Sequence, residues 1–225
     1  MEDTIPLRIS ITPELGVSAL LLRPADPRAC LVLAHGAGAG MHHSFLADLV
    51  KALGARGVAT LRYQFPFMEQ GSKRPDSPAV AHQAVRAAAA EARRRCPGIP
   101  LFAGGEAFGG PMTSQAQSEE ALEGVKGIVF VGFPLHPAGQ PSTTRAEHLE
   151  RVALPLLFLQ GTRDTLADLA LIRDVTGQLG SRATLQVEDG ADHSFHVLAR
   201  SGRRDAEVME SLADATAAWM ASSAR

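Results

Sequence analysis

Short apolar runs alternate with longer amphipathic segments along most of this chain, and this alternation limits the folds open to it. The run at residues 30–34, Cys-Leu-Val-Leu-Ala, is apolar at every position, as in a strand buried on both faces. On the same grounds we expect strands at residues 7–11, 17–22, 30–34, 58–61, 101–103, 128–131, 156–159 and 184–187.

The longer segments carry helical periodicity. Apolar residues recur at i, i+3, i+4 and i+7 from Leu46 to Leu53, with Ser44 in place to cap this helix and Gly54 to stop it. Strands that alternate with helices predict a mostly parallel sheet covered on both faces, which is a three-layer α/β/α sandwich of about eight strands. The predicted helices cover residues 44–53, 79–96, 108–120, 168–179 and 205–220.

Composition restricts the class of protein and its partners. With 225 residues, 45% hydrophobic and 20% charged, the chain has ordinary globular composition, and we predict one domain over residues 1–225. A formal net charge of -2 gives no basic footprint for nucleic acid or for an anionic membrane. The basic run at residues 93–95 is expected as the last turn of a helix, where cations suit the dipole.

The number of cysteines and the N-terminal sequence bear on the cellular compartment in which the protein is expected. Cys30 and Cys96 are too few for a disulfide framework or a metal site, so buried thiols are expected. Residues 1–6 lack the basic and apolar regions of a signal peptide, and no apolar run approaches the roughly 18 residues of a membrane span. We therefore expect a soluble cytoplasmic protein that does not enter membranes.

The candidate site lies in the loops that follow the strands, because ligands bind at the carboxyl ends of such sheets. Residues 104–110 have the form of a nucleophile elbow, with Gly105 and Gly109 at the glycine positions of Gly-x-Ser-x-Gly. Ala107 stands where the serine would be, and a methyl group cannot attack a carbonyl. An acid, Asp164, and a histidine, His193, follow later strands in the order nucleophile, acid, histidine.

Other residues compete for these roles. Asp164 could cap the helix that follows it, His193 could be an ordinary loop histidine, and Asp168 and Asp192 are alternative acids. Glu106, one residue before the elbow centre, is expected to point away from the histidine. Ser114 lies two helical turns further on, about 10 Å away, so we expect no surrogate nucleophile.

With these motifs the chain resembles the α/β-hydrolase superfamily over nearly its whole length. Within it, the chain looks most like the small lidless group that contains testis-expressed protein 30 and the KANSL3-like hydrolase domains. The motifs that carry the resemblance lie at residues 35–40, 62–66, 105–110, 112–116, 133–137 and 192–196. It implies an α/β-hydrolase fold without a large cap, and hydrolysis of carboxylic esters or thioesters.

The resemblance also implies roles for single residues. His193 would be the general base and Asp164 would orient it, while the backbone N–H groups of Ala37 and Phe108 would form the oxyanion hole. Ala107 departs from the pattern, and so does Pro111, where the group usually carries arginine.

Several residues near these loops are candidates for a substrate pocket. The alternative for the apolar ones is that they cover the core. The histidines show no zinc-site spacing, and residues 36–40 miss the dinucleotide pattern, so we expect no metal and no cofactor. The predicted substrate-binding residues are His35, Gly36, Phe65, Phe67, Met68, Leu135 and His136.

Ala107 leaves two interpretations open. In the first, the parent protein is a serine esterase and Ala107 is a deliberate Ser→Ala change that leaves this chain inactive or nearly so. In the second, alanine is natural, and the chain is a pseudoenzyme that binds a ligand or acts as a scaffold. The first predicts a small ester-like substrate, and the second predicts a partner whose affinity is the same with serine or alanine at residue 107. The short lid region would allow a homodimer to cover the rim of the site.

Overall fold

The computed structural model describes residues 4–225, so the first three residues of the N-terminal segment discussed above lie outside it. It contains an eight-stranded sheet in the order β1-β2-β4-β3-β5-β6-β7-β8. The β1/β2 and β2/β4 pairs are antiparallel, and every later pair is parallel. The strands are β1 (Thr4–Ser10), β2 (Gly16–Leu22), β3 (Ala29–Ala34), β4 (Val58–Tyr63), β5 (Leu101–Glu106), β6 (Val125–Val131), β7 (Leu156–Gly161) and β8 (Ala183–Glu188).

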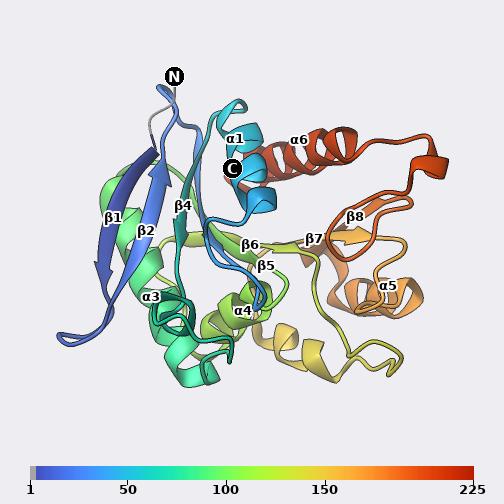
Figure 1. The fold of residues 1–225 in the computed structure, drawn as a ribbon, viewed down its shortest axis with the longest axis horizontal. Helices are drawn as coiled ribbons and strands as arrows, with labels where there is room; N and C mark the ends of the chain where they lie inside the picture. Colours follow the sequence, from blue (N-terminus) through green and yellow to red (C-terminus); the bar gives the residue numbers. More distant parts are fainter. Residues whose placement is uncertain (1–3) are drawn as a thin grey trace.

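Helices cover both faces of the sheet (Figure 1). Helices α1 (Ser44–Gly54) and α6 (Asp205–Ser223) pack on one face. The other face carries α3 (Pro78–Arg95), α4 (Gly109–Glu119) and α5 (Leu169–Leu179). This arrangement confirms the predicted three-layer α/β fold with a mostly parallel sheet.

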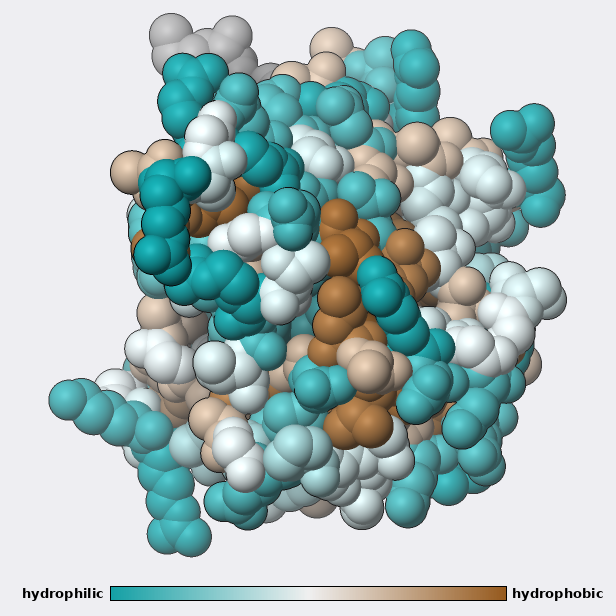
Figure 2. Space-filling view, turned by 90° about the vertical axis from the view of Figure 1, so that its right-hand side faces the viewer, coloured by the Kyte–Doolittle hydropathy of each residue, from teal (hydrophilic) through white to brown (hydrophobic). Residues whose placement is uncertain are grey.

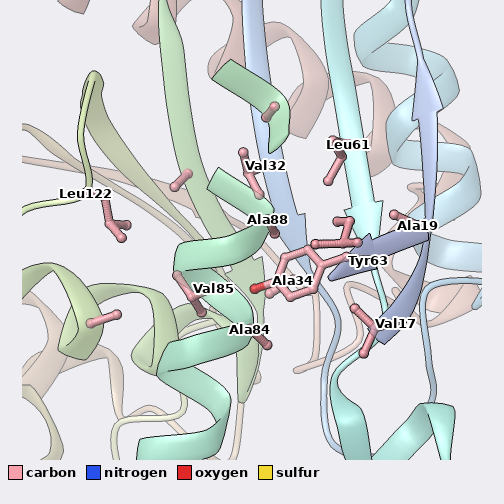
Figure 3. Packing of buried hydrophobic residues seen from close by; sticks show 14 of the residues in the cluster. Val17, Ala19, Val32, Ala34, Leu61, Tyr63, Ala84, Val85, Ala88 and Leu122 are labelled. Atoms are coloured by element: carbon pink, nitrogen blue, oxygen red, sulfur yellow. The ribbon is translucent and has the colours of Figure 1, made fainter. Parts of the chain in front are cut away.

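The core under α3 shows how small residues bring a helix close to the sheet. Ala84, Val85 and Ala88 of α3 face the strands, with the Tyr63 side chain between helix and sheet (Figure 3). Alanine has no side-chain entropy to lose and a high helix propensity, so an alanine-rich helix can pack closely on a sheet at little cost.

The loops contain only short helices. The helix α2 (Pro66–Glu69) follows β4, and the 3-10 helix η1 (Thr144–Arg151) lies between β6 and β7. Within residues 4–225, no large cap therefore covers the carboxyl ends of the central strands, as predicted.

Two local predictions are corrected by the structure. Ser44 is the first residue of α1 and not its cap; His43 holds the cap position without a side-chain hydrogen bond. Strand β5 continues through Gly104 and Gly105 to Glu106, beyond the predicted end at residue 103. Glycine usually weakens a strand, but here a Cβ on Gly104 would overlap the Val129 carbonyl of β6, so close backbone approach requires glycine.

The outer surface is largely hydrophilic. On the face shown in Figure 2, hydrophobic residues gather in a central strip bordered by hydrophilic ones, and a smaller hydrophobic area lies at the upper left. Ile5 is the only large hydrophobic side chain exposed in residues 4–225. None of the helices in this range combines the length and apolar character that a membrane crossing needs.

The close approach at Gly104 predicts a stability effect. Gly104→Ala should lower the free energy of unfolding by about 3 kcal/mol, because the added methyl forces β5 and β6 apart. Gly177→Ala, in α5 and with open space around its Cα, should raise it by about 0.5–1 kcal/mol. Urea unfolding of both variants measures this, and an equal effect of the two would contradict the packing argument.

Candidate active site

The turn from β5 into α4 is strained at Ala107. This residue has φ +43°, a left-handed conformation that costs a non-glycine residue about 1–3 kcal/mol. Its N–H donates to the Val131 carbonyl over 3.0 Å, and its own carbonyl accepts from the Gly110 N–H over 3.0 Å. The backbone thus has the sharp strand-to-helix turn of a nucleophile elbow, although the side chain is a methyl.

The two elbow glycines are required by the same turn. A Cβ on Gly105 would overlap the backbone of Gly109. A Cβ on Gly109 would lie only 2.7 Å from the Ala34 Cβ and the His35 carbonyl oxygen. The turn therefore packs directly against the end of β3 and the start of the loop that follows it.

His193 and Asp164 come together beside this turn. His193 Nδ1 lies 2.8 Å from Asp164 Oδ2, and the Asp164 side chain is 1% exposed. Asp164 also accepts from the Gln160 amide and from the Leu166 N–H, each over 2.8 Å. Its carboxylate is thus held in one orientation, which leaves Nδ1 of His193 protonated and Nε2 turned away from Asp164.

The competing acids have other partners. Asp168 caps α5 by accepting from the Leu171 N–H over 3.1 Å. Asp192 accepts from the N–H groups of Ser194 and His196 within its own loop. Neither is hydrogen-bonded to His193.

The surroundings of His193 favour its charged form. Burial disfavours the imidazolium, but the hydrogen bond and charge of Asp164, with the charges of Glu106 and Asp192, outweigh it and raise the pKa of His193. In this pair His193 therefore binds a proton more tightly than a free imidazole does.

A cavity of about 720 Å³ lies in front of these groups, a volume typical of small-molecule sites. Ala107, Phe108, Ala37 and His193 all line it. Neither the Ala37 N–H nor the Phe108 N–H donates a hydrogen bond to another group in residues 4–225. The apolar part of the wall consists of Phe108, Pro111, Met112, Pro134 and Leu166, and the polar part includes Gln115, Arg145 and Ser194.

Most of the predicted substrate-binding residues do not reach this cavity. Gly36 lines it, whereas Phe65, Phe67 and Leu135 are buried in the core and Met68 packs against that core. The rings of Phe65 and Phe67 pack edge-to-face against the ring of Phe108, with centroid distances of 5.4 and 6.1 Å. The alternative interpretation, that these loop residues cover the core, describes their position.

The two predicted histidines are structural as well. His35 is fully buried, accepts from the Phe65 N–H over 2.9 Å at Nε2 and donates from Nδ1 to the Gly36 carbonyl over 2.6 Å. Burial lowers its pKa, so it is neutral and joins two loops. His136 likewise accepts from the Asp168 N–H over 2.8 Å.

Glu106 is the residue that the sequence reasoning placed wrongly. Its half-buried side chain lines the cavity together with Ala107 and His193. Burial raises the pKa of Glu106, and the charges of His43 and His193 and the Gly36 N–H oppose that rise. The Glu106 side chain leaves the sheet on the face that α1 covers. Because α1 begins only at Ser44, it does not cover the sheet at Glu106, and the side chain can reach the cavity.

Metal binding has no support from side-chain placement. Within residues 4–225, no three histidine, cysteine, aspartate or glutamate side chains are grouped to share an ion. Cys30 and Cys96 are both buried as free thiols.

Comparison with known proteins agrees with the fold. A family model described as "Alpha/beta hydrolase domain" matches residues 27–221. This chain therefore belongs to the α/β-hydrolase family.

Solved structures of bacterial hydrolases have the same fold. A dienelactone hydrolase from Anabaena variabilis superposes with a TM-score of 0.78 at 18% identity, covering 100% of this chain and 99% of that one. A serine hydrolase without a lid from Xanthomonas campestris gives 0.75 at 21% identity, covering 96% and 95%. An esterase domain from Rhodothermus marinus gives 0.74 at 16% identity, covering 99% and 100%.

The hydrogen bond between His193 and Asp164 predicts a change in titration. Asp164→Asn should lower the pKa of His193, because burial remains while the carboxylate charge is lost. NMR titration of the imidazole Cε1 proton measures it, with Asp174→Asn on the exposed side of α5 as the control. An unchanged His193 pKa in Asp164→Asn would show that the pair is not coupled.

The same shift has a consequence for stability. A raised folded-state pKa means that protonated His193 stabilises the fold fully below its ordinary pKa of about 6.5, and that this contribution is lost as the pH rises through the folded-state value. The difference in unfolding free energy between this chain and His193→Gln should therefore shrink from pH 5.5 to about pH 8.5. A difference that grows with pH would contradict it.

Proposed function

We propose that this chain carries the ligand site of a carboxylic-ester or thioester hydrolase of the Ser-Asp-His type, with Ala107 at the position of the nucleophile. The observation that carries the proposal is His193, which is joined to the buried Asp164 over 2.8 Å and lines the same cavity as the strained elbow residue Ala107. The names of similar structures, a dienelactone hydrolase, a serine hydrolase and an esterase domain, support an ester as the ligand.

Each part has a role in this proposal. The N–H groups of Ala37 and Phe108 would bind the carbonyl oxygen of the ester, and His193 would exchange a proton with the attacking or leaving group. Ala107 supplies no hydroxyl, so no acyl-enzyme forms. Loss of a triad nucleophile typically removes about 10⁶-fold in turnover and leaves about 10³–10⁴-fold over water. The chain with Ala107 would bind esters and turn them over slowly or not at all.

A natural pseudoenzyme is the second candidate, and Glu106 is the observation that favours it. A carboxylate in the cavity beside the oxyanion N–H groups opposes the negative charge that develops on the carbonyl oxygen during acyl transfer. Pro111, the other departure from the resembled group, also lines the cavity. In this case ligand binding, rather than turnover, is the function of the site.

Two further expectations remain predictions. One is a cytoplasmic location, and the other is a homodimer that covers the rim of the cavity. Size-exclusion chromatography with light scattering would test the homodimer.

Restoring the hydroxyl tests the proposed function. Ala107→Ser should raise the hydrolysis of p-nitrophenyl acetate by at least about 10³-fold and allow covalent labelling by a fluorophosphonate, because the elbow already has the required backbone geometry. The double variant Ala107→Ser/His193→Ala should show no such gain. A folded Ala107→Ser protein that neither turns over nor labels would contradict the esterase-type site.

A further inference from the structure

Glu106 is a cavity residue that the proposed chemistry does not use. We propose that its carboxylate makes the cavity selective for ligands with a positive charge next to the carbonyl group held by the elbow. This inference rests on the proposed function in one respect: the ligand is taken to occupy the same cavity.

The position of Glu106 beside the elbow is defined by its neighbours. It directly precedes Ala107, and a Cβ placed on Gly36 would lie 3.8 Å from the Glu106 carboxyl carbon and 3.5 Å from the Ala107 Cβ. The Glu106 carboxylate therefore lies close to the elbow, where the carbonyl carbon of a bound ester would sit. A cationic group four bonds from that carbon, as in the choline ester of a carboxylic acid, can reach the Glu106 carboxylate.

The two carboxylates near the elbow, Asp164 and Glu106, differ in their charged partners. Asp164 is matched by His193, to which it is hydrogen-bonded. Glu106 makes no ion pair within 4 Å with a lysine or arginine in the described part of the chain. The titratable groups that face Glu106 are His43 and His193, and His193 is already hydrogen-bonded to Asp164. The Glu106 carboxylate thus has no ion-pair partner of its own in residues 4–225 and, when ionised, adds negative charge to the elbow end of the cavity.

The cavity wall also contains a positively charged residue, Arg145. Arg145, on η1, donates to the Pro134 carbonyl over 3.4 Å and is exposed to solvent. An exposed guanidinium is screened by water, whereas a half-buried carboxylate is screened less. Glu106 therefore dominates recognition at the elbow end.

The remaining walls suit a bulky organic cation. Phe108 presents a half-buried ring beside Glu106, and aromatic faces attract cations. Pro111, Met112 and Leu166 supply apolar contact for the methyl or methylene groups around the charge. An ammonium-bearing ester, rather than a neutral or anionic one, is the ligand class that these groups recognise together.

Two ester probes of the same shape test the charge alone. Acetylcholine, the acetate ester of choline, carries a trimethylammonium group where 3,3-dimethylbutyl acetate carries a tert-butyl group. The chain with Ala107 is used so that turnover of either ester is minimal. By NMR titration the cationic ester should bind at least about tenfold more tightly. Monoethyl succinate, an anionic ester, should bind most weakly. Equal affinities for the first two, or tightest binding of the anion, would overturn the proposal without any variant.

A variant then assigns the effect to Glu106. Glu106→Gln keeps the shape of the side chain and should reduce the preference to within about twofold. Glu123→Gln removes the same charge from an exposed position, 82% exposed at the side chain, and should leave the preference unchanged. A preference that survives in folded Glu106→Gln would show that another group selects the cation.

The inference and the proposed function can fail separately. If Ala107→Ser hydrolyses p-nitrophenyl acetate but the cationic ester has no advantage, the charge selectivity is wrong and the esterase-type site stands. If the cationic ester binds selectively while Ala107→Ser stays inactive, the cavity recognises cations but the proposed hydrolase chemistry is wrong.

Discussion

The close backbone approach at the end of β5 is the constraint on which the rest of this structure depends. Gly104 lies against the Val129 carbonyl of β6, and Gly109 lies against Ala34 at the end of β3. Three central strands thus meet at one turn, whose residue Ala107 is held at φ +43° by a hydrogen bond to Val131. The strain can persist because the neighbouring strands determine the backbone there more strongly than the local preference of alanine does.

The electrostatics of the site follow from this packing. Asp164 is buried and accepts three hydrogen bonds, so its carboxylate is held in one orientation toward His193. Glu106 has no such set of donors, and burial therefore makes its ionised form more costly. The two carboxylates near His193 are in this way chemically different. One is a fixed orienting group, and the other is available to a ligand.

The alternation of strands and helices could be predicted from periodicity, because a doubly covered sheet imposes apolar runs of strand length and amphipathic segments of helix length. The ends of the elements were less predictable. Strand β5 extends through two glycines because β6 lies too close for a side chain, and that closeness is a property of the neighbouring strand.

The residues of the candidate site also differ in how far they could be predicted from the sequence. Asp164 and His193 could be singled out because each follows a strand whose carboxyl end faces the elbow, and the structure brings them within 2.8 Å. Phe65, Phe67 and Leu135 could not be assigned to core or cavity, since an apolar side chain in a loop satisfies both environments. Their burial depends on how the loops pack against the core, which no local pattern records.

The sequence by itself determined the fold class, the family resemblance and the identity of the residue at the elbow, because these depend on periodicity, spacing and residue type along the chain. Only the tertiary structure decided which side chains face the cavity. Glu106 faces it because α1 begins ten residues after the end of β3 and leaves that face of β5 uncovered. The direction of a side chain at a strand end depends on what the neighbouring elements leave open, and therefore on packing rather than on sequence position.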